Sequence, residues 1–177
     1  MSSKTVAVLA VDGFEQAELV EPIKAIESAG HRAVVVSAKK DQIRGMNHDE
    51  KGDLFDVHLT FAEADSEPDH FDAVVLPGGV VNADEIRMHP KACSLVQKVN
   101  SAGKPIAVIC HGGWLLISAG LVNGRRLTSF PSLKDDLRNA GAQWEDAEVV
   151  EDGNLISSRT PDDLPAFNRA LLDRLSR

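Results

Sequence analysis

The chain has 177 residues, of which 43% are hydrophobic and 26% charged, a globular mixture that excludes disordered, collagen-like and disulfide-scaffold proteins. Its 19 Lys and Arg stand against 27 Asp and Glu for a net charge of −8, and without a basic stretch nucleic acid is not expected as a stable partner. We expect one domain over residues 1–177, and a cytoplasmic protein without a membrane partner, because the apolar run at residues 6–11 is too short for a signal peptide or a membrane span.

The first third of the chain predicts a strand, a helix and a second strand. Residues 5–11 are a β-branched apolar run typical of a buried strand, and apolar residues then recur at helical spacing over residues 16–30. Residues 32–37 predict the second strand, so the unit implies parallel strands joined by a right-handed crossover. Residues 39–52 favour a loop or a short peripheral hairpin, and alternation over residues 54–59 predicts an edge strand.

Two further buried strands follow. Residues 71–76 form the clearest one, and Pro77-Gly78-Gly79 ends it abruptly. A helical pattern covers residues 86–102, and residues 105–109 predict the next strand. A helix starts again directly, from Gly112 or Gly113.

The last part of the chain is mixed. Residues 132–140 predict an amphipathic helix, residues 147–158 two strands joined by a turn, and Thr160-Pro161 the start of a final helix. Alternating strands and helices of this kind predict an α/β fold, a doubly wound, mostly parallel sheet with helices on both faces, as in flavodoxin-like proteins. Ligands bind such sheets outside the carboxyl ends of the strands, which directs attention to residues 12–18, 77–79 and 110–113.

Cys110 stands where a buried strand gives way to a helix. It is followed by His111-Gly112-Gly113, so the backbone must turn from extended to helical within about one residue. Such an elbow lifts the side chain out of the sheet at a helix start, where the helix dipole and free N–H groups favour a thiolate. We therefore predict a nucleophilic Cys110; the alternative is a small buried hydrophobic residue.

His111 has two candidate roles beside this thiol. Its imidazole could be the base or acid, but neighbouring side chains at a sharp turn often diverge, so its backbone N–H is favoured as one donor of an oxyanion hole. Gly78 or Gly79 would supply the second donor, since glycine lets the main chain approach a ligand. The alternative is that these glycines only form a tight exit from the strand.

Glu15 and Glu18 lie three residues apart at the start of the first helix. They could simply complement the helix dipole. Because they also lie near the carboxyl end of the first strand, one of them could hydrogen-bond the Cys110 sulfur and set its protonation and oxidation chemistry. We favour Glu18 for this contact and place Glu15 second.

No cofactor and no metal ion are expected. Cys93 lies within a helical pattern and is expected to pack on a helix face, and the other histidines show no ligand spacing. The dinucleotide-binding and P-loop glycine patterns are both missing from the sequence.

Five motifs occur in an order that is specific as a set. They are Phe71-Asp-Ala-Val-Val-Leu-Pro-Gly-Gly79, Gly103-Lys-Pro-Ile-Ala-Val-Ile-Cys-His-Gly112, Leu116-Ile-Ser-Ala-Gly120, Gly141-Ala-Gln-Trp144 and Ser157-Ser-Arg-Thr-Pro-Asp-Asp-Leu-Pro-Ala-Phe167. Together they resemble the PfpI family of intracellular cysteine peptidases and stress-protective deglycases, over almost the whole chain. The resemblance implies the class I glutamine amidotransferase-like fold, shared with the parkinsonism-associated deglycase, and a homodimer or higher homo-oligomer.

By this resemblance the family nucleophile falls on Cys110, its neighbouring histidine on His111 and its sulfur-contacting glutamate on Glu18. In some ring-forming members a carboxylate of an adjacent subunit orients the histidine, and Asp84 is the nearest candidate, although the segment after Gly79 is one residue longer than the family pattern. Phe130 stands where peptidase members often carry tyrosine, which weakens the case for peptide hydrolysis.

Three hypotheses follow. The first is a cysteine-dependent hydrolase in which Cys110 attacks the carbonyl carbon of methylglyoxal, glyoxal or their protein adducts, so that the partner is a small carbonyl compound or a glycated protein. The second keeps the nucleophile and makes the substrate a peptide bond. The third is a non-enzymatic sensor of oxidative stress in which Cys110 is oxidised to a sulfinic acid held by Glu18.

Overall fold

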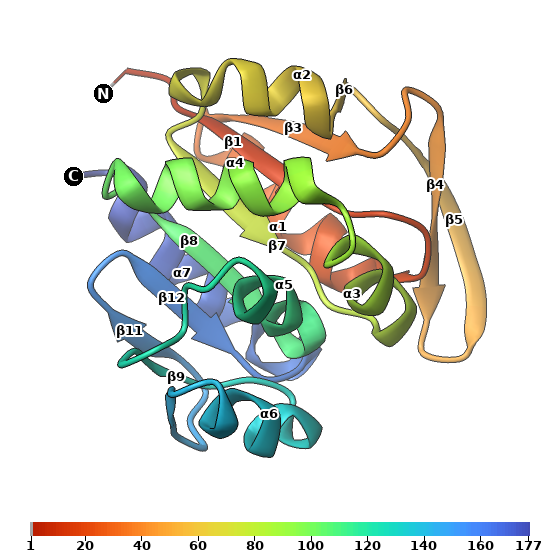
Figure 1. Cartoon of the computed structure of the whole chain (residues 1–177). Helices are drawn as coiled ribbons and strands as arrows, with labels where there is room; N and C mark the ends of the chain where they lie inside the picture. Colours follow the sequence, from red (N-terminus) through yellow and green to blue (C-terminus); the bar gives the residue numbers. More distant parts are fainter. Residues whose placement is uncertain (1) are drawn as a thin grey trace.

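The computed structural model describes residues 2–177 and builds them around one seven-stranded sheet (Figure 1). The strand order is β11-β12-β8-β7-β1-β3-β6, in which only the β11–β12 pair is antiparallel. The doubly wound, mostly parallel sheet predicted from the sequence is therefore confirmed. The strands are β1 (Thr5–Leu9), β3 (Arg32–Ser37), β6 (Leu59–Thr60), β7 (Ala73–Leu76), β8 (Ile106–Ile109), β11 (Val150–Asp152) and β12 (Leu155–Ser158).

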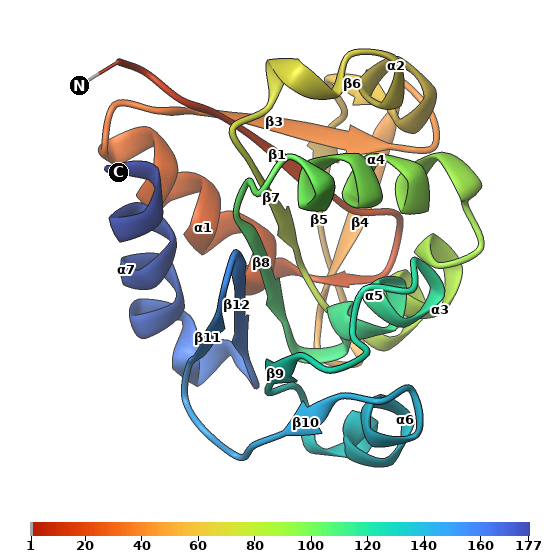
Figure 2. The same cartoon turned by 60° about the vertical axis from the view of Figure 1, so that its left-hand side comes forward.

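Helices cover both faces of this sheet (Figures 1 and 2). Helices α1 (Gln16–Ser28) and α7 (Leu164–Leu175) pack on one face. The other face is covered by α2 (Phe61–Ser66), α3 (Val80–Ile86), α4 (Pro90–Ser101), α5 (Gly113–Ser118) and α6 (Lys134–Asn139). Within residues 2–177, no helix combines the length and the apolar character that crossing a membrane requires.

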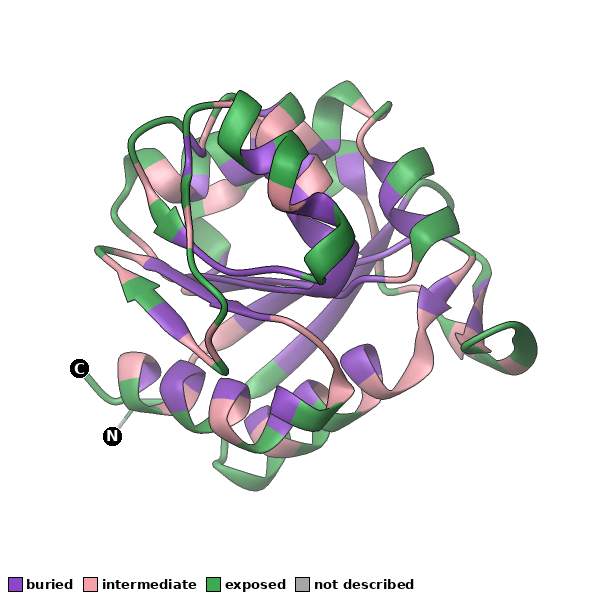
Figure 3. Cartoon of the chain, turned by 90° about the horizontal axis from the view of Figure 1, so that it is seen from below, coloured by how far each residue is buried: buried purple, intermediate pink, exposed green. Residues whose placement is uncertain are grey.

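The core lies in two layers because side chains alternate along each strand. In β1, Val6 and Val8 pack toward α1 and α7, whereas Ala7 and Leu9 pack toward α4 and α5. All four side chains are buried. A sheet buried on both faces needs apolar residues at successive positions, which is the pattern of its central strands, and Figure 3 shows these strands enclosed between the two helical layers.

The edge strand predicted at residues 54–59 is divided between two strands, β5 (Glu50–Asp56) and β6, each at the edge of a different sheet. Strands β4 (Gln42–Asn47) and β5 form a hairpin that joins β2 (Phe14–Glu15) in a separate three-stranded sheet, and β6 is the edge of the main sheet. Within β5 the alternation follows the two faces of the hairpin, because Phe55 packs against the core while Leu54 is exposed. The hairpin alternative for residues 39–52 is confirmed, and Figure 1 shows it projecting beyond the main sheet.

Two helical predictions also need correction. The helix predicted at residues 86–102 corresponds to α4, which begins only at Pro90, because Pro90 occupies its first position and residues 87–89 link it to α3. The short helices α2 and α3 were not predicted. The final helix, α7, begins at Leu164 after a 3₁₀ turn at Pro161–Asp163, and the Thr160 side chain makes no capping hydrogen bond.

The sheet order sets the position of the site. Strands β1, β7 and β8 are neighbours, so the segments that follow them emerge side by side at one edge. From β1 the chain crosses to β3 on one side, and from β7 it crosses to β8 on the other. The carboxyl ends of β1 and β7 therefore flank the switch point at which open α/β sheets bind ligands.

Candidate active site

The backbone bends sharply at Cys110. Its φ is 60°, a left-handed conformation that few residues other than glycine adopt, and it opens a 3₁₀ turn over Cys110–Gly112 directly after β8. The Phe130 N–H donates to the Cys110 carbonyl at 3.1 Å and helps to hold the bend. A Cβ at Gly112 would lie 2.7 Å from the Leu76 carbonyl oxygen, which explains glycine there. The strand-to-helix elbow is confirmed.

Glu18 is fully buried beneath this elbow. Its Oε1 accepts the Gly78 N–H at 2.9 Å, and its carboxyl group contacts the Cys110 thiol. Burial, reinforced by the neighbouring charge of Glu15, raises the pKa of Glu18 to about 8. At neutral pH the carboxyl group is mostly protonated, so it can donate a hydrogen bond to the sulfur.

The protonation of Cys110 differs from our expectation of a thiolate favoured by the helix start. Burial of the sulfur and, next in size, the nearby Glu18 charge raise the pKa of the Cys110 thiol above its usual range. The N–H groups of Gly79 and His111 face the sulfur and lower its pKa. Because protonation of Glu18 removes the charge repulsion, the thiolate is most accessible while Glu18 carries its proton.

His111 contacts the thiol with its ring, so the expected divergence of the two side chains is wrong. Its Nδ1 lies 3.1 Å from Cys110 Sγ and its Nε2 lies 3.3 Å from Ser132 Oγ. The imidazole stacks on Phe130 with ring centroids 4.7 Å apart. Burial lowers the pKa of His111, and a neutral imidazole can accept the thiol proton.

The two glycines expected at the oxyanion hole have different tasks. The Gly78 N–H is used by Glu18, so Gly78 is not free to stabilise an oxyanion. The Gly79 N–H faces the sulfur, as does that of His111. These two groups form the donor pair that the geometry leaves available.

Gly79→Ala should be much more damaging than Gly30→Ala. Both residues have nearly the same positive φ, 86° and 83°, so both substitutions carry the backbone penalty of about 1–2 kcal/mol. A Cβ at Gly79 would also collide with the Gly13 carbonyl oxygen and come within 2.6 Å of the Glu15 nitrogen, whereas nothing lies within 4 Å of one at Gly30. We expect Gly79→Ala to cost about 1–3 kcal/mol more. Urea unfolding of both variants measures the difference, and equal losses would contradict the close packing of this turn.

Glu15 and Asp84 do not touch the sulfur or His111. Glu15 accepts the His48 N–H at 3.2 Å through Oε2, at the tip of the β4–β5 hairpin. It acts on the thiol only at a distance, through its charge. Asp84 is exposed on α3 and lies outside the lining of the cleft, so within one chain it does not orient His111.

A cleft of about 760 Å³ opens onto Cys110, Glu18 and His111. Its further walls include His48, Phe130 and Asp162. Sequence reasoning missed His48 and Asp162, as well as Ser132 beside His111. No spacing could have indicated them, because each comes from a separate segment that only the folded chain brings to the cleft.

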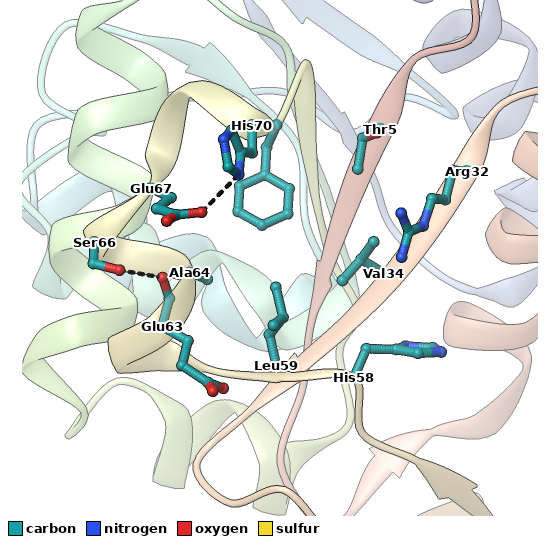
Figure 4. Close-up of a pocket in the computed structure, with 11 residues that line it drawn as sticks. Thr5, Arg32, Val34, His58, Leu59, Glu63, Ala64, Ser66, Glu67 and His70 are labelled. Carbon is teal, nitrogen blue, oxygen red and sulfur yellow. Dashed lines mark hydrogen bonds and ion pairs between the residues drawn. The ribbon is translucent and has the colours of Figure 1, made fainter.

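A second cavity, of about 690 Å³, lies at the opposite end of the sheet, where Thr5 and Arg32 begin β1 and β3. Figure 4 shows two interactions among the residues that line it. Glu67 pairs with His70 at 2.8 Å, and Ser66 Oγ donates to a main-chain carbonyl. Neither Cys93 nor Cys110 lines it. Across the part of the chain that the structure describes, no cluster of three His, Cys, Asp or Glu is arranged to hold a metal ion.

The fold and the bent Cys110 junction define a doubly wound α/β protein with a cysteine at the carboxyl edge of its sheet. The chain matches the DJ-1/PfpI family over residues 4–174 and belongs to this family. It is 42% identical to the protein named Deglycase PfpI of Pyrococcus furiosus, over 94% of this chain and 96% of that protein. Protein/nucleic acid deglycase 2 of Escherichia coli is 39% identical, over 96% of each chain.

A solved structure shows the same fold. A two-domain protein of Anabaena variabilis, with DJ-1/ThiJ/PfpI-like and ferritin-like domains, superposes with a TM-score of 0.92 at 35% identity. The match covers 98% of this chain and 48% of the Anabaena chain. The resemblance inferred from the five motifs is thereby confirmed.

Proposed function

We propose that this protein is a cysteine-dependent deglycase that acts on methylglyoxal, glyoxal or their adducts on proteins. The observation that carries the proposal is that one sulfur contacts both a proton acceptor and a proton donor. The acceptor is the neutral imidazole of His111, and the donor is the protonated carboxyl group of Glu18. The names of the relatives from Pyrococcus furiosus and Escherichia coli support this substrate class.

The proposed chemistry needs no external oxidant or reductant. His111 Nδ1 takes the thiol proton as Cys110 Sγ bonds to the aldehyde carbon of methylglyoxal, which gives a hemithioacetal. Transfer of the hydrogen from this carbon to the adjacent carbonyl carbon converts the hemithioacetal into a lactoyl thioester. Water then cleaves the thioester to lactate and free thiol, so that methylglyoxal and one water become one lactate. For a protein adduct, the bond from Cys110 Sγ to the carbon that bears the hydroxyl group forms as its C–N bond breaks, and the amine or guanidine nitrogen leaves with the proton that His111 took from the thiol; the same hemithioacetal results.

Each group around the sulfur suits one part of this sequence. The Gly79 and His111 N–H groups face the sulfur and are placed to stabilise the oxygen that becomes negative when the carbonyl is attacked. The proton on Glu18 is available to that oxygen. The cleft lining includes Glu15 and Asp162 but no Lys or Arg, which favours neutral or cationic adducts over anionic substrates.

Peptide hydrolysis is supported less well. His111 Nε2 meets the Ser132 hydroxyl and not a carboxylate, and Phe130 offers no hydroxyl to a substrate. A second copy of the chain could provide a carboxylate from its own Asp84, which is exposed, and we propose a homo-oligomer on that basis. The oxidative-sensor hypothesis uses the same pair, Cys110 and Glu18, and stays a prediction.

A direct assay separates the two enzymatic hypotheses. Purified protein is incubated with methylglyoxal, with methylglyoxal-treated N-acetylarginine and with a fluorogenic peptide amide, and lactate and free fluorophore are measured. We expect lactate from the first two substrates and little or no fluorophore from the third. Peptide cleavage without lactate release would overturn the proposed function in favour of the peptidase hypothesis.

A further inference from the structure

Asn82 is a buried amide that none of the catalytic roles above uses. It lies in the first turn of α3 and is 1% exposed. Its Oδ1 accepts the Val11 N–H at 2.8 Å, just beyond β1. Its Nδ2 donates to the carbonyl oxygens of Pro77 at 3.2 Å and Gly78 at 3.0 Å. One side chain therefore ties the exit of β1 to the turn that follows β7.

The two carbonyl groups that Asn82 holds belong to particular peptide units. The Pro77 carbonyl shares its peptide plane with the Gly78 N–H, which donates to Glu18 at 2.9 Å. The Gly78 carbonyl shares its plane with the Gly79 N–H, which faces the Cys110 sulfur. Because a peptide unit is planar, fixing its carbonyl fixes the direction of its N–H. A hydrogen bond to the carbonyl also polarises the unit and strengthens its N–H as a donor.

Asn82 is the main hydrogen-bond donor to the carbonyl groups of Pro77 and Gly78. Gly78 and Gly79 have no side chains, and Gly79 adopts φ 86° and ψ 127°. Besides Asn82, the Gly78 carbonyl accepts the Glu15 N–H at a longer 3.3 Å. An amide is the side chain that fits all three partners, since it accepts one hydrogen bond and donates two.

We propose that Asn82 is a positioning residue for the reaction of Cys110, because its single side-chain NH₂ group holds both peptide units whose N–H groups face Glu18 and the sulfur. The chemistry assigned to the sulfur rests on the proposed function, but the role of Asn82 in setting thiol reactivity does not.

The test uses Asn82→Asp in a Cys93→Ala background, so that Cys110 is the only thiol. Aspartate keeps the size of the side chain and an acceptor for Val11, but it replaces the donor by an oxygen that repels both carbonyl groups. We expect the pH profile of Cys110 alkylation by iodoacetamide to move upward by about one pH unit, so that alkylation at pH 7 is about tenfold slower. The kcat for lactate release should fall about tenfold while KM changes little. Effects of this size correspond to the loss of hydrogen bonds of ordinary strength. Asn82→Ala, which adds no charge, should shift both readouts in the same direction.

Asn154→Asp in the same background is the matched control. The Asn154 amide also donates to a main-chain carbonyl, that of Lys104 at 2.8 Å, but at the amino end of β8. It should lower the unfolding temperature and leave the alkylation profile unchanged.

The proposal is overturned if folded Asn82→Asp and Asn82→Ala both keep the parent alkylation profile, or if Asn154→Asp shifts it equally. Should Asn82→Asp fail to fold, Asn82→Ala decides alone. If the parent protein releases no lactate, the proposed function fails, whereas alkylation still decides the role of Asn82.

Discussion

Replacing Cys110 by alanine is expected to abolish lactate release from methylglyoxal and from glycated arginine, with a loss of about a thousandfold or more in kcat/KM. The reason is that every step of the proposed reaction passes through a bond to this sulfur, and within residues 2–177 the other cysteine, Cys93, does not line the cleft. The measurement is the initial rate of lactate formation at equal concentrations of folded protein.

Two further variants make this result specific. Cys93→Ala should keep most of the activity, since its sulfur contacts the Arg87 carbonyl in another part of the fold. Cys110→Ser keeps the size of the side chain but not the thiol, and should be nearly as inactive as alanine. Full lactate release by Cys110→Ser would refute nucleophilic catalysis by this residue.

In the wild type, the free energy of unfolding is expected to fall as the pH rises from 4.5 to 8, and Glu18→Gln is expected to abolish most of this fall. The pKa of Glu18 is raised from 4.5 to about 8 by burial, so between these values the folded protein binds a proton that the unfolded chain has released. Stability then falls as pH rises. Since a tenfold difference in proton affinity equals about 1.4 kcal/mol, the free energy of unfolding should fall by about 5 kcal/mol in total. Below pH 4.5 both states carry the proton and the effect vanishes.

Urea unfolding at a series of pH values measures this effect as the difference between wild type and Glu18→Gln, which cancels the contributions of other titrating groups. Glutamine can still accept the Gly78 N–H and donate to the sulfur, so the variant should fold and exceed wild-type stability at pH 8.5. Glu21→Gln, exposed on the same helix, is the control and should keep the wild-type slope. A parallel pH dependence in Glu18→Gln would contradict a protonated Glu18.

The main sheet could be predicted because its signal is local. Residues 71–76 and 105–109 are apolar at nearly every position, which is what a strand covered on both faces requires. The predictions failed mainly at element boundaries, where a local pattern runs past the end of an element. Alternation over residues 54–59 crosses from the end of β5 to the start of β6, and the helical pattern of residues 86–102 begins before α4, which starts at Pro90.

The candidate site likewise contains features that the sequence predicts and features that it does not. The elbow at Cys110 and the contact with Glu18 were predicted, because a cysteine between a buried strand and a glycine pair, and an acid at a helix start beside the first strand, are visible in the sequence. Asn82 and Ser132 were not, because a buried amide or a hydroxyl shows no pattern until its partners are known.

By itself, the sequence determined the alternation of strands and helices and therefore the edge of the sheet at which Cys110 must lie, since apolar periodicity and glycine positions are properties of neighbouring residues. Only the tertiary structure decided three features of the site. These are the protonation of the groups around the sulfur, the availability of the Gly79 N–H and not the Gly78 N–H as a donor, and the hydrogen bonds from Asn82 to the turn that contains both glycines. These depend on burial and on contacts between residues as far apart as Val11 and Asn82, and desolvation acts on a group only after the surrounding chain has excluded water.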